Sequence, residues 1–463
     1  MSDVLDQLGN LIGAENIATD ALTLESHGRD WTRFYEPDPL AVVFPRDIVM
    51  VQTIVQFALS HALALVPSGG RTGLSGGAVA KQQELVVSFD KMNRILDYNE
   101  VEMTVDVEPG VVTEAVQNFA EEKGLLYPVD FASAGSSQIG GNIATNAGGI
   151  KVLRYGLTRD WVLGLTVVTG KGELLELNKG LIKNATGYDL RHLFIGSEGT
   201  LGLIVGATLK LANPQKNPEV LLLAASRMQD VIAVLGRFRE QVALSAFEFF
   251  SEQALQHVLH DQGGPHPFTD AAPYYILLEF ENINTSAMEA AMTAFEDCMT
   301  AGWISDGIVS QSGSQRQELW SYREGISEAI TPYTPYKNDI SVRISKVPDF
   351  LDAVEALVLA KYPDFEIVWF GHIGDGNVHL NILRPESWTV ADFKAECEKV
   401  SNEVMQIVEQ FAGSVSAEHG VGLLKRDQLG FSRSPEELTM MRAIKQVFDP
   451  AGIMNPGKVF SPL

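Results

Sequence analysis

Apolar and polar positions in the first half of the chain follow patterns that predict a mixed α+β domain. From Leu40 the sequence reads LAVVFPRD, then an amphipathic segment over 49–61, then LALVPSGG. This order predicts a strand, a helix and a second strand that ends in a glycine-rich turn. The run from Val162 to Val168 predicts a further strand, and the run from Gly199 to Leu211 predicts two paired strands. We expect one α+β domain over 1–212.

The pattern changes at Pro218, where apolar runs begin to alternate with longer amphipathic segments. The runs LLLAAS, FEFF and YYILLEFE are separated by helical patterns, and a further helix is expected from Thr285 to Thr300. This alternation predicts an antiparallel sheet covered by helices on one face. We expect a second domain over 213–424. The last segment, 425–463, contains a predicted helix from Pro435 to Val447 and is expected to pack on the first domain.

Composition limits the class of protein. At 463 residues the chain is too long for a single hydrophobic core, and its 59 acidic against 35 basic residues give a formal charge of -24. Such a charge disfavours nucleic acid and anionic membrane surfaces as partners. No apolar run reaches the length of a membrane span, and the N-terminal residues are acidic rather than basic, so we expect a cytoplasmic protein. Cys298 and Cys397 lack CxxC spacing, which excludes a cysteine-ligated iron–sulfur cluster within the chain and predicts ordinary core or surface thiols.

The loop PSGGRTGLSGGAV, residues 67–79, has five glycines within nine residues directly after a predicted buried strand. Glycine lets backbone N–H groups converge on an anion without a Cβ in the way. Arg71, Thr72 and Ser75 add donors that a merely flexible loop, the alternative interpretation, would not need. The loop therefore predicts a pyrophosphate site.

Two other phosphate-binding loops fit less well. The spacing in 67–79 does not match the G-x-G-x-x-G pattern of Rossmann domains. Residues 452–459, GIMNPGKV, have a G-x-x-x-x-G-K frame, but Val459 stands where a Ser or Thr should bind magnesium, and a proline interrupts the loop. We do not expect an ATP site.

A second glycine-rich segment, Ser136 to Gly156, mixes glycines with short amide and hydroxyl side chains. Together with the loop 67–79 it resembles the FAD-binding domain of the vanillyl-alcohol-oxidase type flavoproteins, which implies two α+β subdomains. The blocks Lys183 to Ile204 and Asn455 to Lys458 are similar to those of the glycolate oxidase and D-lactate dehydrogenase branch. The loop 67–79 has no His or Cys for a covalent link, so we expect non-covalent FAD. The residues expected to bind it are Pro67, Gly69, Gly70, Arg71, Thr72, Gly73, Leu74, Ser75, Ser136, Gly140, Gly141, Asn142, Thr145, Asn146, Gly148, Gly149, Tyr155, Gly156, Gly199, Ile204 and Asn455.

The segment WFGHIGDGNVHLNIL, residues 369–383, places Asp375-Gly376 between apolar runs. This dipeptide predicts a two-residue hairpin turn. If these two residues form the turn, His372 lies directly opposite His379, with Cβ atoms roughly 4.5–5.5 Å apart. Asn381 projects from the same face and is expected to help orient the substrate. Two imidazoles so placed can share a divalent metal ion, and two core histidines bonded to carbonyl groups are the alternative.

A third ligand is expected from SVSAEHGVG, residues 414–422, where Glu418 stands beside His419. Adjacent side chains reach one site only where a strand ends, which Gly420 and Gly422 permit. We assign Glu418 as a ligand and His419 as a base, with the reverse assignment open. Such ligands suit zinc without excluding manganese, cobalt or iron. The two blocks resemble those of the D-2-hydroxyglutarate dehydrogenase family, in which a His, His, Glu set holds the metal and the neighbouring His acts as base.

The helical pattern from Leu319 to Lys346 places Arg323 and Ser327 four residues apart, hence on one helical face, and Lys337 begins an alternating strand. An Arg, a hydroxyl and a Lys together can hold a carboxylate, whereas a solvated charged face is the alternative. In the resembling enzymes the corresponding residues contact the substrate carboxylate. Ser327 stands where that family would have Thr.

The resemblance implies that D-2-hydroxyglutarate is oxidised to 2-oxoglutarate, with His419 taking the hydroxyl proton while hydride passes to the flavin N5. D-malate, D-lactate and glycolate stay open as substrates. Electron-transfer flavoprotein or a quinone is the implied electron acceptor, and a homodimer is a further expectation. Two other classes remain: a flavin-binding module of a larger redox complex, and an oxidase that reduces oxygen.

Overall fold

The chain forms two compact units in the computed structural model, which describes residues 2–32 and 34–461. The first unit contains the residues up to Gly148, then Gly156–Pro214, and then the chain from Glu418 onward. The second unit contains Gly149–Tyr155 and Gln215–Ala417. The short excursion Gly149–Tyr155 was not predicted, because it lies inside a glycine-rich segment that we assigned whole to the cofactor domain.

A four-stranded sheet in the first unit confirms the predicted strand, helix and strand. Its order is β1-β2-β4-β3, with β2 and β3 each parallel to β4 and β1 antiparallel to β2. Helix α3, Ile48–His61, connects β2 to β3 and begins at Asp47, whose side chain accepts the N–H of Met50. The strands are β1 Ile17–Ala18, β2 Ala41–Val43, β3 Leu65–Ser68 and β4 Leu85–Ser88.

The second sheet of this unit is antiparallel, with the order β5-β6-β9-β7-β8. Its strands are β5 Ile95–Asn99, β6 Thr104–Val107, β7 Val162–Thr169, β8 Leu174–Leu177 and β9 Gly202–Lys210. The prediction of two paired strands from Gly199 to Leu211 was wrong, because β9 is one strand that pairs with β6 and with β7. Gly206 lies beside a register shift against β7 rather than in a turn.

The C-terminal segment belongs to the first unit. Helix α16, Pro435–Phe448, starts with a capping box between Ser434 and Glu437. Beyond it, the N–H of Leu65 donates to the carbonyl of Ile453, and Met454 bridges to Leu65 of β3. The other helices of this unit are α1 Ser2–Ile12, α2 Ala21–His27, α4 Thr113–Glu122, α5 Ile139–Thr145, α7 Thr158–Trp161 and α8 Arg191–Phe194. Among the described residues, no helix combines the length and the apolar character that a membrane crossing needs.

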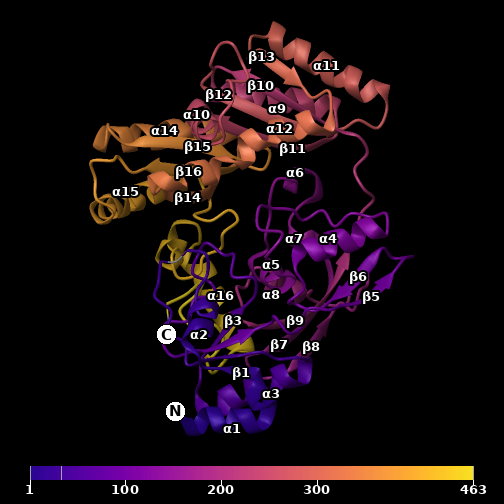
Figure 1. Ribbon diagram of the computed structural model, residues 1–463, viewed down its shortest axis with the longest axis vertical. Coiled ribbons are helices and arrows are strands. Elements are labelled where there is room, and N and C mark those ends of the chain that lie inside the picture. The colour runs from indigo at the N-terminus through magenta and orange to yellow at the C-terminus, as the bar shows by residue number, and fades with distance from the viewer. Residues whose placement is uncertain (1, 33, 462–463) are drawn as a thin grey trace. The chain divides into compact units, whose positions relative to one another are not determined.

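The second unit contains the predicted antiparallel sheet, which has seven strands in the order β13-β10-β12-β11-β15-β16-β14 (Figure 1). The strands are β10 Pro218–Ala225, β11 Leu244–Ser251, β12 Tyr274–Glu281, β13 Ile304–Val309, β14 Tyr336–Ser341, β15 Glu366–Gly371 and β16 Asn377–Leu383. The helices are α6 Val152–Tyr155, α9 Met228–Gln241, α10 Glu252–Gln262, α11 Thr285–Thr300, α12 Gly313–Glu324, α13 Ile326–Ala329, α14 Val347–Lys361 and α15 Val390–Gln410.

Helices pack on both faces of this sheet, not on one as expected. On one face, Val368 and Phe370 share a core with residues of α10, α12 and α13. On the other, the indole N–H of Trp369 donates to Glu355 of α14 at 2.8 Å. Strand β11 is buried along its whole length because both faces are covered.

Candidate active site

A cleft of about 900 Å³, its open mouth included, lies within the first unit beside the loop that follows β3. Thirteen of the residues expected to bind FAD line the cleft, namely Pro67, Gly69, Gly70, Arg71, Thr72, Gly73, Ser75, Gly140, Gly141, Asn142, Thr145, Gly199 and Ile204. The cleft therefore gathers both glycine-rich segments that the sequence singled out.

Eight of the expected residues do not line the cleft: Leu74, Ser136, Asn146, Gly148, Gly149, Tyr155, Gly156 and Asn455. Gly149 and Tyr155 belong to the second unit. The amide of Asn455 donates instead to the carbonyls of Gly77, at 2.9 Å, and Glu198, at 2.7 Å. Asn455 therefore holds together two segments of the cleft wall.

The two glycine-rich segments approach so closely that a side chain does not fit between them. A Cβ on Gly70 would lie 2.2 Å from the carbonyl oxygen of Ser136. The neighbouring Arg71 donates to the carbonyl of Gly69 at 2.8 Å and lies 3.6 Å from Asp90. Burial opposes ionisation of Asp90, but hydrogen bonds from His27 and Gln138 and the charge of Arg71 lower its pKa to about 2.

Sequence reasoning missed two acidic residues in the cleft wall, Asp30 and Glu198. Asp30 accepts the N–H of Gly76 at 2.7 Å, and Glu198 accepts the N–H groups of Val421 and Gly422, each at 2.7 Å. Burial raises the pKa of both carboxyl groups. Glu198 lies in a block that we had compared with flavoproteins, so its place was detectable, whereas no local pattern marks Asp30.

The predicted hairpin forms, but the two-residue turn was wrong. Strands β15 and β16 pair with Phe370 opposite His379, and residues 372–376 form the connection. The N–H groups of Asp375 and Gly376 both bond to the carbonyl of His372. The register differs from the expected one by two residues. Because side chains on a strand alternate with a period of two, this shift leaves His372 and His379 on one face of the sheet.

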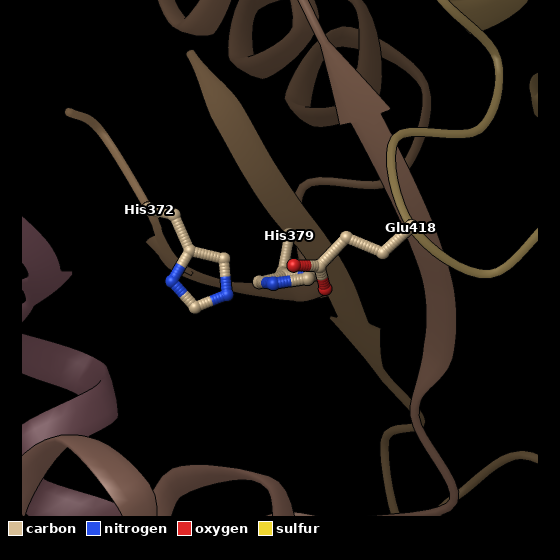
Figure 2. A group of neighbouring side chains, drawn as sticks. All are labelled: His372, His379 and Glu418. Atoms are coloured by element: carbon tan, nitrogen blue, oxygen red, sulfur yellow. The ribbon is translucent and has the colours of Figure 1, made fainter. Parts of the chain in front are cut away.

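His372 and His379 nevertheless meet, with ring centroids 5.5 Å apart and ring planes at 82°. Glu418 follows Ala417, whose N–H donates to Asp339 at 3.1 Å. One ligand atom from each of His372, His379 and Glu418 lies within 4.8 Å of the others (Figure 2). Two imidazoles and a carboxylate form a donor set that fits a divalent cation such as zinc.

The predicted base is next to this group. Glu418, His419 and Asp339 also offer ligand atoms within 4.8 Å of one another. Both side chains of the Glu418-His419 pair can approach one place because this segment is not a regular strand and Gly420 has a φ of 79°. The backbone at Gly420 therefore departs from a regular strand, as expected from the glycines in this segment.

Two of the predicted substrate residues share the sheet face of the histidines. Lys337 pairs with Asn381 between β14 and β16, and Asp339 pairs with His379 two residues along. Loss of hydration in the surrounding protein lowers the pKa of Lys337, although part of the residue is exposed to solvent. The amide of Asn381 donates to the carbonyls of Val368 and His379.

Arg323 and Ser327 lie in two successive helices rather than in the single helix predicted. Helix α12 ends at Glu324, and Ser327 lies in the separate helix α13. Arg323 is 6 % exposed, and its Nε is buried with no hydrogen-bond partner, whereas Ser327 is exposed. The break at Gly325, which we did not treat as a helix end, separates the two.

The chain matches two family profiles. The profile described as FAD binding domain covers residues 39–178, and the profile described as FAD linked oxidases, C-terminal domain, covers residues 214–459. The two matches contain most of the cleft wall and all of the histidine hairpin.

Similar curated proteins match over almost the whole chain. D-2-hydroxyglutarate dehydrogenase of Stutzerimonas stutzeri is 56% identical over 99% of this chain and 99% of its own length. The enzyme of the same name from Xanthomonas citri pv. viticola is 54% identical over 98% of this chain and 96% of its own length. The mitochondrial D-2-hydroxyglutarate dehydrogenase of Arabidopsis thaliana is 34% identical over 97% of this chain and 80% of its own.

Solved structures support the same fold at low sequence identity. A p-cresol methylhydroxylase structure with bound substrate aligns with a TM-score of 0.77 at 15% identity, covering 99% of this chain and 97% of that one. The 4-ethylphenol oxidase of Gulosibacter chungangensis aligns with a TM-score of 0.75 at 15% identity, covering 100% of this chain and 97% of that one. With a glycine-lined cleft, matching profiles and full-length relatives in agreement, the chain belongs to the FAD-linked oxidase family, as an FAD-dependent oxidoreductase in the group that contains the D-2-hydroxyglutarate dehydrogenases.

Proposed function

We propose that this protein oxidises D-2-hydroxyglutarate to 2-oxoglutarate and needs a divalent cation to do so. The observation that carries the proposal is the convergence of His372, His379 and Glu418, whose ligand atoms lie within 4.8 Å of one another. The names of the relatives at 56% and 54% identity support the choice of substrate.

Bound FAD would supply a two-electron acceptor, and a bound divalent cation would supply Lewis acidity. The glycine-rich cleft would hold the FAD, and His372, His379 and Glu418 would hold the cation, for which zinc is the first choice. Three protein ligands would leave room for substrate, as they do in the catalytic zinc sites of other enzymes.

His419 takes the proton of the substrate's α-hydroxyl group. The oxidation removes one proton and one hydride, and the proton needs a base near neutral pH, which an imidazole provides. His419 is next to a ligand of the cation, so it lies where the hydroxyl group would be bound. Support for this role comes from the group formed by Asp339, Glu418 and His419.

Arg323 and Lys337 bind the second carboxylate of the substrate, and Asn381 helps to orient the molecule. The Nε of Arg323 is buried and has no hydrogen-bond partner. Its N–H can donate to a carboxylate oxygen of the substrate. Lys337 and Asn381 are register partners and project from one face. Ser327 remains a prediction from the sequence alone.

The electron acceptor, electron-transfer flavoprotein or a quinone, stays a prediction from the resemblance. A homodimer, a cytoplasmic location and additional turnover of D-malate are likewise expectations from the sequence. None of them is needed for the proposed reaction.

Anaerobic mixing of the purified flavoprotein with candidate acids tests the proposal. D-2-hydroxyglutarate should bleach the flavin absorbance faster than D-malate, D-lactate or glycolate, and a chelator should slow that bleaching. Equal rates with D-lactate would overturn the substrate assignment. Bleaching that is unchanged after complete removal of metal would overturn the role of the cation.

A further inference from the structure

One acidic side chain lies in the middle of the apolar strand β11, whose sequence is LSAFEFFS. This residue, Glu248, is 1 % exposed. A carboxylate withdrawn from water is costly unless charged or hydrogen-bonding groups compensate it. The contacts of Glu248 therefore indicate what keeps an acid at this position.

The first contact is with His372. Strands β11 and β15 pair with Phe249 opposite Gly371 and Phe250 opposite Phe370, and the same register continued by one residue places Glu248 opposite His372. The distance from Nδ1 of His372 to Oε2 of Glu248 is 2.7 Å. Because an ionised carboxylate only accepts, Nδ1 donates, and Nε2 remains as the ligand atom. Figure 2 shows one ring nitrogen of His372 pointing toward His379 and Glu418.

The second contact is with Arg323. Its Nη2 lies 2.9 Å from the same Oε2 of Glu248, and both side chains are buried. The guanidinium group lies over the ring of Phe370, with 4.8 Å from Cζ to the ring centroid. On such an apolar support a guanidinium needs a counter-charge, and Glu248 provides it.

We propose that Glu248 is a positioning residue shared by the cation site and the substrate-carboxylate site. Its carboxylate orients the imidazole of His372 so that Nε2 faces the cation, and it holds the guanidinium of Arg323 so that Nε stays available to the substrate. The inference rests on the proposed function, since it assigns Glu248 to the same site. Carboxylates that orient a metal-ligating histidine typically change metal affinity or activity by 10- to 100-fold when removed.

Glu248→Gln tests the inference because it keeps the size of the side chain and removes its charge. Chelator-stripped protein titrated with Zn²⁺ should bind roughly 10- to 100-fold more weakly than wild type, with unchanged flavin content. KM for D-2-hydroxyglutarate should rise more than KM for D-lactate, which has no second carboxylate for Arg323. Glu248→Asp, which restores the charge on a shorter side chain, should recover part of both losses.

Glu279→Gln is the matched control. Glu279 is also buried in the central sheet, on the neighbouring strand β12, but it pairs with Lys151 and Trp320. Its substitution should leave Zn²⁺ affinity and the KM ratio unchanged. Equal losses in both variants, or wild-type Zn²⁺ affinity in Glu248→Gln, would overturn the role of Glu248 while leaving the proposed function intact. Wild-type protein that binds no Zn²⁺, Co²⁺ or Mn²⁺ would instead overturn the proposed function, and this inference with it.

Discussion

The glycine-lined cleft and the histidine hairpin are built in different ways. The cleft is made largely of backbone in loops. Glycines there let two segments approach so closely that a Cβ on Gly70 would lie 2.2 Å from the carbonyl oxygen of Ser136. The hairpin site is made of side chains on one face of a sheet, where strand register decides that Glu248, His372 and His379 meet. A loop site is therefore sensitive to added volume, and a sheet site is sensitive to the identity of each side chain.

His379→Ala should give the largest effect, because it removes one of the three proposed ligands of the cation. We expect loss of bound metal together with loss of turnover, measured by elemental analysis and by a dye-linked assay. His257→Ala is the control, since His257 is a histidine of the same unit that pairs with Glu366. Full activity in a metal-free His379→Ala protein would refute the role of the cation.

His419→Ala should lower turnover by ~10²–10⁴ while flavin and metal remain bound, because general-base catalysis contributes about that much. Rapid-mixing measurement of flavin reduction gives the rate, and elemental analysis gives the metal content. If metal is lost and the remaining rate is higher than this range allows, the roles of Glu418 and His419 are reversed.

Gly70→Ala and Gly141→Ala test the two glycine-rich segments that line the cleft. A Cβ on Gly70 would meet backbone atoms of Ser136 and Ser137 at 2.2 and 2.8 Å, so the unfolding free energy should fall by about 1–3 kcal/mol. A Cβ on Gly141 meets no protein atom within 4 Å but enters the cleft. The apoprotein should keep its stability, and FAD affinity should fall by about tenfold for each 1.4 kcal/mol of repulsion. Unchanged FAD affinity in Gly141→Ala would place the flavin elsewhere.

Lys458→Met should give the smallest effect. Burial lowers the pKa of Lys458 to about 8 from its ordinary 10.5, so between these values the unfolded chain binds more protons than the native one. Wild-type stability should therefore rise as the pH increases through this window, by on the order of 1 kcal/mol, and the variant should lack that rise. Denaturant unfolding at pH 7.5 and 9.5 measures it, with exposed Lys91→Met as the control. Parallel pH profiles for wild type and Lys458→Met would contradict the expectation.

The loop cleft was predicted more accurately from the sequence than the details of the sheet site. The glycine-rich segments and the family resemblance together predicted the cleft, and thirteen of the residues expected to bind FAD line its wall. The hairpin was recognised from Asp375-Gly376, but its connection is the longer segment 372–376, in which the carbonyl of His372 accepts two N–H groups. The helix break at Gly325 separated Arg323 from Ser327, which local periodicity did not indicate.

Local chemistry in the sequence was sufficient to predict which glycine-rich segments line the cleft, where several strands and helices run, and which His, Glu and Arg residues are candidates for a site. These properties depend on backbone freedom, side-chain periodicity and residue type, all of which are local. The tertiary structure alone decided that Glu248 faces His372 and Arg323, and that Asp30 and Glu198 enter the cleft wall. Those contacts join residues far apart in the chain, and only the pairing of strands and the closure of loops set the distance between them.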